Sequence, residues 1–243
     1  MRNFIARARR AFWTFKQPIA KVPKLLGMPV SDLFVWRKSD VWQTFFELTD
    51  ISGLFLDDEK IPERYVKFLF FNDKGELFFE KCLNVIPNQR LTIDLSEFLS
   101  NSQCTFGTFC VFHSYTPKVI SDLGSFITER GYLSYRYSGA PLRAYVHGNF
   151  DAIALCPDRT LEMLGINSLL PREFRLQHEL LGPALYEIVI INPSSKVQHL
   201  SCHVRTRQSG TNLVIHKASV MPRGTRVFKV KLEQSSVARI IIN

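Results

Sequence analysis

Residues 64–85 read RYVKFLFFNDKGELFFEKCLNV, and this stretch indicates the fold class. Its first part, residues 64–72, is rich in Val, Phe and Leu, a composition that is typical of a buried strand. Asp73-Lys74-Gly75 supplies the residue types of a tight turn, and residues 76–85 run back as a second strand. The stretch therefore predicts an antiparallel hairpin within an antiparallel sheet.

Segments of the same kind recur along the chain with turn residues between them. Most are 6 to 10 residues long, which suits a sandwich or a barrel better than an alternation of strands and helices. Between them, helical spacing is found at residues 118–129, and residues 160–164 resemble one short turn. We expect a mainly β protein of two antiparallel β-sandwich-like units with few short connecting helices. The further strands are expected at residues 91–95, 105–114, 184–192, 197–205, 212–220, 225–232 and 237–242.

The chain divides into three parts on this interpretation. Residues 1–40 form a basic amphipathic arm and a proline-containing connector. Residues 41–156 form the first unit, which includes a hairpin at 131–151, and residues 157–243 form the second unit. Both units contain an Asn-ended strand, a return strand and a proline turn that starts an alternating strand. Either an internal duplication or the common reuse of the same turn chemistry explains this likeness.

The positive charge is concentrated in the arm. Residues 1–40 hold nine of the 31 Lys and Arg residues and two of the 22 acidic residues, which is a net charge of +7 out of +9. The remaining residues are close to neutral, and this makes a protein that binds nucleic acid over its whole surface unlikely.

Residues 2–16 predict an amphipathic helix with aromatic residues on one face and arginines on the other. This pattern favours docking to an anionic membrane surface or to a partner protein. Docking on the protein's own body or on a sister subunit, and a role as a targeting segment, are the alternatives. The docking residues would be Phe4, Arg7, Arg10, Phe12 and Phe15.

The segment with the strongest signal for a binding site is residues 131–151, which holds four of the seven tyrosines of the chain. A strand period of two places alternate polar and aromatic residues on one face, and the Gly139-Ala140-Pro141 turn would bring a second strand beside it. Aromatic rings, guanidinium groups and an amide suit a polar ligand, although such a face also occurs as plain protein surface. The candidate ligand-binding residues are Tyr132, Arg136, Arg143, Tyr145, His147 and Asn149.

Signals for catalysis and for metal binding are weak. His147 is a candidate general base that Asp151 or Asn149 would orient. His199 and His203 flank Cys202, but on a strand Cys202 points to the opposite face, so we expect no metal site and no cofactor. The five cysteines are widely spaced and lack a CxxC pair, which indicates a reducing compartment or indifference to redox and predicts small, buried and unreactive side chains.

These observations lead to one leading hypothesis and two alternatives. The leading hypothesis is a non-catalytic binding module for a small polar ligand or glycan, such as a carbohydrate or sugar derivative, in the cytoplasm or at the periphery of a membrane. One alternative is a hydrolase or transferase that uses His147. The other is a structural β-sandwich subunit that assembles into a homo-oligomer.

Overall fold

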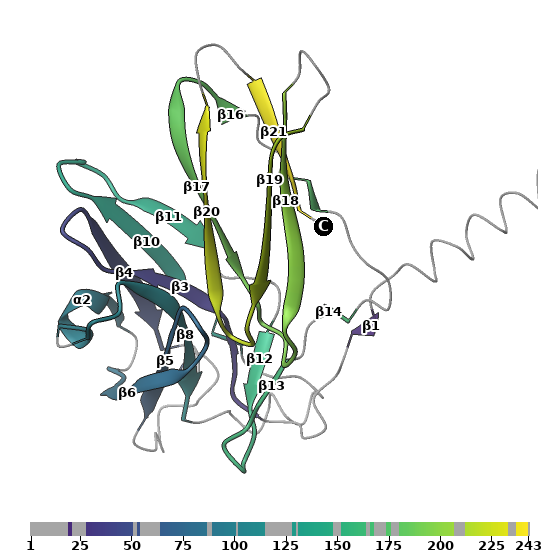
Figure 1. Cartoon of the computed structure of the whole chain (residues 1–243). Coiled ribbons are helices and arrows are strands. Elements are labelled where there is room, and N and C mark those ends of the chain that lie inside the picture. Colours follow the sequence, from purple (N-terminus) through teal and green to yellow (C-terminus); the bar gives the residue numbers. More distant parts are fainter. Residues whose placement is uncertain are drawn as a thin grey trace, which may run out of the picture.

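The computed structural model shows a mainly β protein (Figure 1). The arm helix expected over residues 2–16, with Phe4, Arg7, Arg10, Phe12 and Phe15, lies outside the described residues, as do positions 118–127 of the expected connecting helix. No helix in the described ranges is both long and apolar enough to cross a membrane. Those ranges are 19–20, 28–50, 53, 64–86, 89–100, 102–114, 128–129, 131–147, 152–163, 166–167, 174–175, 180–206, 212–232 and 237–242.

Two four-stranded sheets build the first unit. One has the order β11-β10-β4-β7, and the other has the order β3-β8-β5-β6. Their paired strands are antiparallel, as the sequence predicts. The bounds are β3 (Phe34–Arg37), β4 (Trp42–Thr49), β5 (Tyr65–Asn72), β6 (Leu77–Asn84), β7 (Arg90–Asp94), β8 (Phe106–His113), β10 (Tyr132–Tyr137) and β11 (Ala144–His147).

The hairpin predicted from residues 64–85 is confirmed as the β5–β6 pair. Asn72 closes the turn, because its Oδ1 accepts hydrogen bonds from the backbone amides of Lys74 and Glu76. Gly75 has φ +80°, a conformation that glycine adopts without a steric cost. One register shift between Phe70 and Phe71 marks a bulge near the turn.

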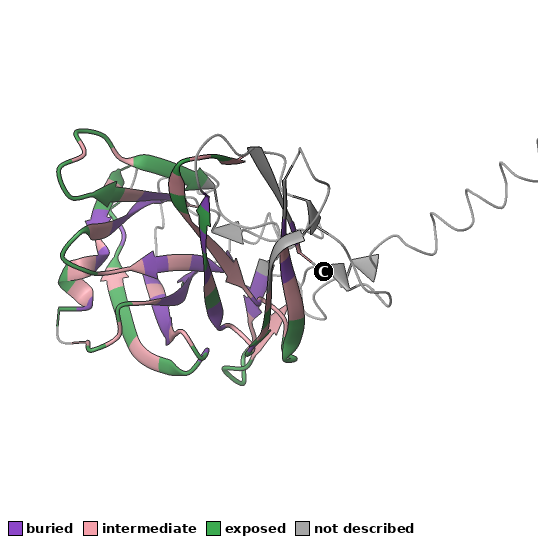
Figure 2. Ribbon diagram, turned by 45° about the horizontal axis from the view of Figure 1, so that its top comes forward, coloured by how far each residue is buried: buried purple, intermediate pink, exposed green. Residues whose placement is uncertain are grey.

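The strands β5 and β8 are apolar on both faces because the sheet that contains them is covered on both sides. Phe68 and Phe109 point into the core of the first sandwich. Leu69 and Phe112 belong to a second cluster on the opposite face, together with Ile153 of β12 (Ala152–Leu155). Figure 2 shows buried stretches on the strands inside the described body and exposed stretches on its loops and on parts of its outer strands.

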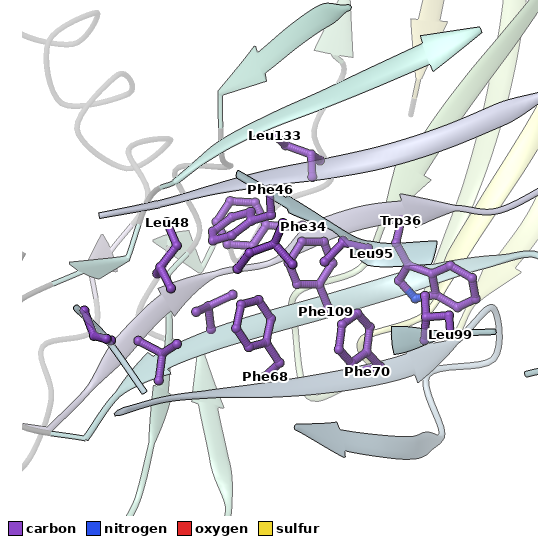
Figure 3. Close-up of a cluster of buried hydrophobic side chains, with 14 residues drawn as sticks. Phe34, Trp36, Phe46, Leu48, Phe68, Phe70, Leu95, Leu99, Phe109 and Leu133 are labelled. Atoms are coloured by element: carbon purple, nitrogen blue, oxygen red, sulfur yellow. The ribbon is translucent and has the colours of Figure 1, made fainter. Parts of the chain in front are cut away.

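The core of the first unit is an aromatic cluster (Figure 3). The Phe109 ring lies at its centre, with centroids 5.1 Å from Phe34, 5.5 Å from Phe46 and 5.4 Å from Phe70. Trp36 closes one end, and its indole Nε1 donates to the carbonyl of Phe71. All these rings are buried, so the sandwich is held mainly by the burial of apolar area.

The second unit is also built from packed antiparallel strands. β17 pairs with β20, while a larger sheet has the order β15-β21-β18-β19, with β16 beside β21. Its core contains Cys202, Val204, Phe228, Val230 and Leu232. The bounds are β15 (Phe174–Arg175), β16 (Leu180–Leu181), β17 (Ala184–Ile191), β18 (Gln198–Thr206), β19 (Asn212–Val220), β20 (Thr225–Leu232) and β21 (Val237–Ile242).

The internal duplication is not confirmed, since equivalent strands of the two halves pair differently. β5 and β6 form a hairpin, whereas β17 and β18, their counterparts in the repeat, lie in different sheets. The turn after Asn192 therefore carries the chain across the second sandwich instead of folding it back on β17. Asn192 still caps its turn through Oδ1, which accepts from Ser194, so the likeness in turn chemistry is real.

A further sheet joins the start of the described body to the segment between the units. It has the order β13-β12-β2-β9, in which β2 and β9 pair in parallel. The unit boundary expected after residue 156 falls inside its β12–β13 hairpin. The remaining bounds are β1 (Ile19–Ala20), β2 (Val30–Asp32), β9 (Thr128–Glu129), β13 (Leu161–Met163) and β14 (Ile166–Asn167), and β1 pairs with β14.

Three local expectations are wrong. Residues 28–37, assigned to the connector, belong to the folded body, and Leu33 and Trp36 are fully buried there. Residues 161–163 form a strand and not a helical turn, because they pair with β12. The strand expected to end at residue 95 gives way to the helix α2 (Leu95–Phe98), whose first turn is capped by the Asp94 carboxylate accepting from the Ser96 amide.

The prediction that the cysteines are buried holds in part. Cys82 is exposed, while Cys110 and Cys202 are buried. Burial raises the pKa of both buried thiols, so neither is a reactive thiolate at neutral pH.

The two units meet at a junction of turns. The β5–β6 turn packs on the turn between β19 and β20, where the Thr225 amide donates to the Asp73 carbonyl over 3.0 Å. Arg37 and Glu187 form an ion pair of 2.7 Å across the same junction. Partial burial opposes ionisation of Glu187, but Arg37 and Lys229 outweigh this effect and lower its pKa.

Gly75→Ala tests this junction. A Cβ on Gly75 would collide with the carbonyl of Pro222, and its positive φ disfavours any residue with a side chain. We expect the free energy of unfolding to fall by about 2 kcal/mol or more, since the left-handed conformation alone costs about 1–2 kcal/mol. Urea denaturation measures the loss.

The control for Gly75→Ala is Gly139→Ala, which has a similar φ of +81° but nothing within 4 Å of the added Cβ. An equal loss of unfolding free energy in both variants would show that the contact between the two turns contributes nothing to the stability of the protein.

Candidate functional site

The hairpin predicted for the candidate site is present over residues 132–147. β10 and β11 pair antiparallel, with Tyr132 opposite His147 and Ser134 opposite Tyr145. The turn between them contains Gly139 at φ +81°, and the Ala140 amide donates to the Tyr137 carbonyl. The strand register, which the sequence leaves open, puts Tyr132 and Arg136 on the same side as Tyr145.

The inner neighbour of β10 is β4, about 90 residues away in the chain. Ser134 lies opposite Phe45, Arg136 opposite Gln43 and Tyr132 opposite Glu47. β7 continues the sheet on the other side, with Thr92 opposite Glu47. The side of the sheet that points away from the core therefore carries one polar surface over four strands, which we call the outer face. Its side chains come from Gln43, Phe45, Glu47, Arg90, Thr92, Asp94, Tyr132, Ser134, Arg136, Arg143 and Tyr145, of which Phe45, Glu47 and Ser134 are buried.

Glu47 is the centre of the outer face. Its side chain is 4% exposed, and its Oε2 accepts from the Thr92 hydroxyl at 2.7 Å and from Arg90 Nε at 3.1 Å. Arg143 lies 3.5 Å from the other carboxylate oxygen. One buried carboxylate thus holds two arginines that come from opposite edges of the sheet. Because these arginines are 57% and 31% exposed, part of each guanidinium remains open to a ligand.

Phe45 is the apolar platform of the outer face. The Cζ atoms of Arg143 and Arg136 lie 4.7 and 5.2 Å from its ring centroid, within the range of cation–π contact. Arg136 also donates to the Gln43 amide oxygen. Stacking and hydrogen bonding fix the direction of both guanidinium groups before any ligand binds.

Two tyrosine rings flank this arrangement. Tyr132 is 49% exposed and Tyr145 54% exposed. Arg90 lies 5.9 Å from the Tyr132 ring centroid, and Arg143 lies 6.0 Å from that of Tyr145. Exposed rings of this kind can stack on the apolar face of a sugar or on another planar group.

A half-open hollow of about 370 Å³ adjoins the outer face at the end of β4 and β10. Arg136 and Gln43 belong to both the hollow and the outer face. Asp40 and the hydroxyl groups of Ser39 and Ser138 add acceptors and donors. The hollow has the size and polarity for a small ligand that carries hydroxyl groups. It is lined by Ser39, Asp40, Val41, Gln43, Arg136, Tyr137, Ser138, Gly139 and Ala140.

The opposite side of the same strands faces the core. Leu133 and Phe46 are buried in the aromatic cluster, and the Tyr135 hydroxyl donates to the Val35 carbonyl at 2.8 Å. Burial raises the pKa of Tyr135, so this hydroxyl keeps its proton and its hydrogen bond. The strands that carry the outer face therefore also form part of the packed core of the first unit.

The structure brings together four of the six candidate ligand-binding residues, namely Tyr132, Arg136, Arg143 and Tyr145. His147 lies opposite Tyr132 in the backbone register. Asn149 and Asp151 lie outside the described residues, so a pairing of His147 with either one stays a prediction.

The histidines of β18 do not share a metal site with Cys202. His199 hydrogen-bonds the Ser219 hydroxyl at 2.8 Å and His203 the Ser201 hydroxyl at 2.9 Å, while Cys202 faces the core. Among the residues with described positions, no cluster of three or more His, Cys, Asp or Glu side chains could hold a metal ion.

The sequence analysis missed the part of the site that β4 and β7 supply. Glu47, Phe45 and Arg90 come from strands far away in the sequence, and their proximity follows from strand pairing. Residues 43–49 offered one local signal. In the part of this stretch that follows Phe45, inward apolar residues alternate with outward polar ones.

Comparisons with protein-family models, with curated proteins and with solved structures gave no match to this chain. The geometry of the outer face and of the adjoining hollow is therefore the basis for a proposed function.

Proposed function

We propose that this protein is a non-catalytic binding module for a polar ligand, such as a carbohydrate or sugar derivative, which binds on the outer face and in the adjoining hollow. The observation that carries the proposal is the set of half-exposed arginines held by one buried carboxylate, Glu47. Groups that are fixed before binding lose little conformational freedom on complex formation.

The residue types agree with this ligand class. Tyr132 and Tyr145 offer exposed aromatic rings, while Asp40 and Gln43 can accept hydrogen bonds from hydroxyl groups. Such a combination of stacking and directional hydrogen bonds fits a sugar, and the arginine forks add a preference for an anionic substituent.

Arg143→Ala is the test of this function. It removes a guanidinium that contacts both Phe45 and Glu47, while Arg90 and Thr92 still hold the Glu47 carboxylate. We expect affinity for the ligand to fall about 10- to 100-fold, as for the loss of a charged hydrogen bond of about 1.5–3 kcal/mol. Titration calorimetry with a panel of neutral and acidic sugars measures the affinity.

Arg226→Ala is the matched control. Arg226 is exposed on β20 of the second unit, away from the outer face, and we expect this variant to bind like the wild type. If no sugar in the panel binds the wild type, or if Arg143→Ala binds as tightly as Arg226→Ala, the proposal is wrong.

The basic arm would complement this binding activity. We propose that residues 2–16 dock the protein to an anionic membrane surface or to a partner, and that it acts in the cytoplasm, peripheral to a membrane. Four arginines and one lysine in this segment carry the positive charge that such a surface attracts.

A further inference from the structure

The outer face carries more cationic than anionic groups. Arg90, Arg136 and Arg143 lie on it, and the Glu47 carboxylate contacts Arg90 and Arg143. The Glu47 carboxylate is shared by Arg90 and Arg143, so it neutralises only one of these two charges. Asp94 of β7 lies opposite Phe45, on the same side of the sheet. Its carboxylate caps α2 and accepts hydrogen bonds from the amide and the hydroxyl of Ser96.

Arg136 is the least neutralised of the three arginines. Its polar partner among the described residues is the Gln43 amide, which has no charge. Arg136 and Arg143 both stack on Phe45, so two like charges are held around one ring. An anionic group between them would offset this repulsion and find two guanidinium forks already in position.

The three arginines come from different strands of the sheet. Arg143 directly precedes β11, Arg136 is on β10, and Arg90 begins β7, beyond β4. Their side chains converge, because Arg90 and Arg143 both contact Glu47, and Arg136 and Arg143 both lie against the Phe45 ring. A carboxylate on a sugar ring can therefore meet two guanidinium groups of this cluster at once.

The same surface also contains groups that suit the hydroxyls of a sugar. Asp40 lines the hollow beside Arg136, and Glu47 lies at the centre of the outer face. Both carboxylates can accept hydrogen bonds from sugar hydroxyls, and the exposed rings of Tyr132 and Tyr145 can stack on sugars.

We propose that the ligand is an acidic glycan, whose sugar rings carry carboxylate groups, and that Arg90, Arg136 and Arg143 bind these carboxylates on the outer face. This inference rests on the proposed function, because it names the ligand class of the same site.

The test compares two ligands that differ only in charge. Titration calorimetry of the full chain uses a tetramer of galacturonic acid and its methyl ester, which keeps the ring and the hydroxyls but has no carboxylate. We expect the acid to bind at least about 10-fold more tightly than the ester, and its affinity to fall as salt is raised, because salt screens charges.

Arg136→Gln assigns the effect to the outer face. This variant keeps an amide in place of the guanidinium, so we expect about a 10-fold loss of affinity for the acid and less than about a twofold change for the ester, since charged hydrogen bonds are the stronger ones. Arg226→Gln is the matched control and should leave both affinities unchanged.

The remaining outcomes separate this inference from the proposed function. Equal binding of acid and ester, lost together in Arg143→Ala, would overturn the acidic glycan and leave a neutral sugar module. A single-stranded oligonucleotide of equal charge that binds more tightly than the acid would overturn it in favour of nucleic acid. Failure of both tetramers to bind the wild type would also overturn it, and the wider sugar panel would then decide the proposed function.

Discussion

Replacing Phe109 by alanine is expected to lower the free energy of unfolding by about 3–5 kcal/mol, the usual cost of truncating a buried phenylalanine. The ring is fully buried and lies between the two sheets of the first sandwich. Its neighbours Phe34, Phe46 and Phe70 belong to three different strands. Since each of these strands is fixed by its own pairing, the rings cannot all move inward to fill the space that is left.

Urea denaturation followed by circular dichroism measures this loss. Tyr145→Ala is the matched control, because it also removes an aromatic ring from the same unit but from an exposed position. We expect the control to lie within about 0.5 kcal/mol of the wild type, as is usual for surface substitutions. Similar losses in the two variants would mean that Phe109 does not lie at the centre of the core.

The fold class could be predicted from sequence because its signals are local. Residues 64–85 contain both strands and the turn of one hairpin, and neither strand depends on a distant partner to be recognised. The same holds for the β10–β11 hairpin, in which the Gly139 turn and the alternation after it are adjacent in the chain.

What the local pattern could not predict was which strands become neighbours. Residues 184–192 and 197–205 look like a hairpin, yet the first pairs with β20 and the second with β19 and β21. Both arrangements bury the same alternating residues, so the sequence pattern does not distinguish them. The choice depends on how two complete sheets pack.

Residues 28–37 were assigned to a connector for a related reason. Three prolines precede or enter this region, and its apolar segments are short. Pro29 stands directly before β2, however, where a missing amide proton costs little. The burial of Leu33 and Trp36 comes from contacts with β5 and β8, which no local pattern reveals.

The candidate site also combines residues that local sequence signals reveal with residues that only distant strand pairing brings together. Arg136 and Arg143 could be selected because they lie on either side of one turn, whereas Glu47, which holds Arg143, is 96 residues away. A single strand, β4, joins site and core, since Phe46 and Leu48 are buried in the cluster while Phe45 and Glu47 face outward. A variant that loosens the core is therefore expected to weaken ligand binding as well, and each binding variant needs a stability measurement beside it.

Arg64→Met is expected to cost about 3–5 kcal/mol of unfolding free energy, because it breaks a buried ion pair and leaves one charge behind. Arg64 Nη1 lies 2.8 Å from Asp50 Oδ2, and the two side chains are 4% and 1% exposed. The pair joins the residue after β4 to the residue before β5. Asp50 also accepts from the Gly53 amide at 3.0 Å, but this single hydrogen bond does not replace a cation.

Lys67→Met is the matched control, since it removes a cation from the same region that pairs with Glu80 near the surface. That pair is 2.6 Å long, with side chains 23% and 46% exposed, and we expect its loss to cost about 1 kcal/mol or less. Adding Asp50→Asn to Arg64→Met should recover part of the stability, because the amide removes the uncompensated charge. If urea denaturation gives equal losses for Arg64→Met and Lys67→Met, or no recovery in the double variant, then burial of an unpaired carboxylate is not what destabilises the protein.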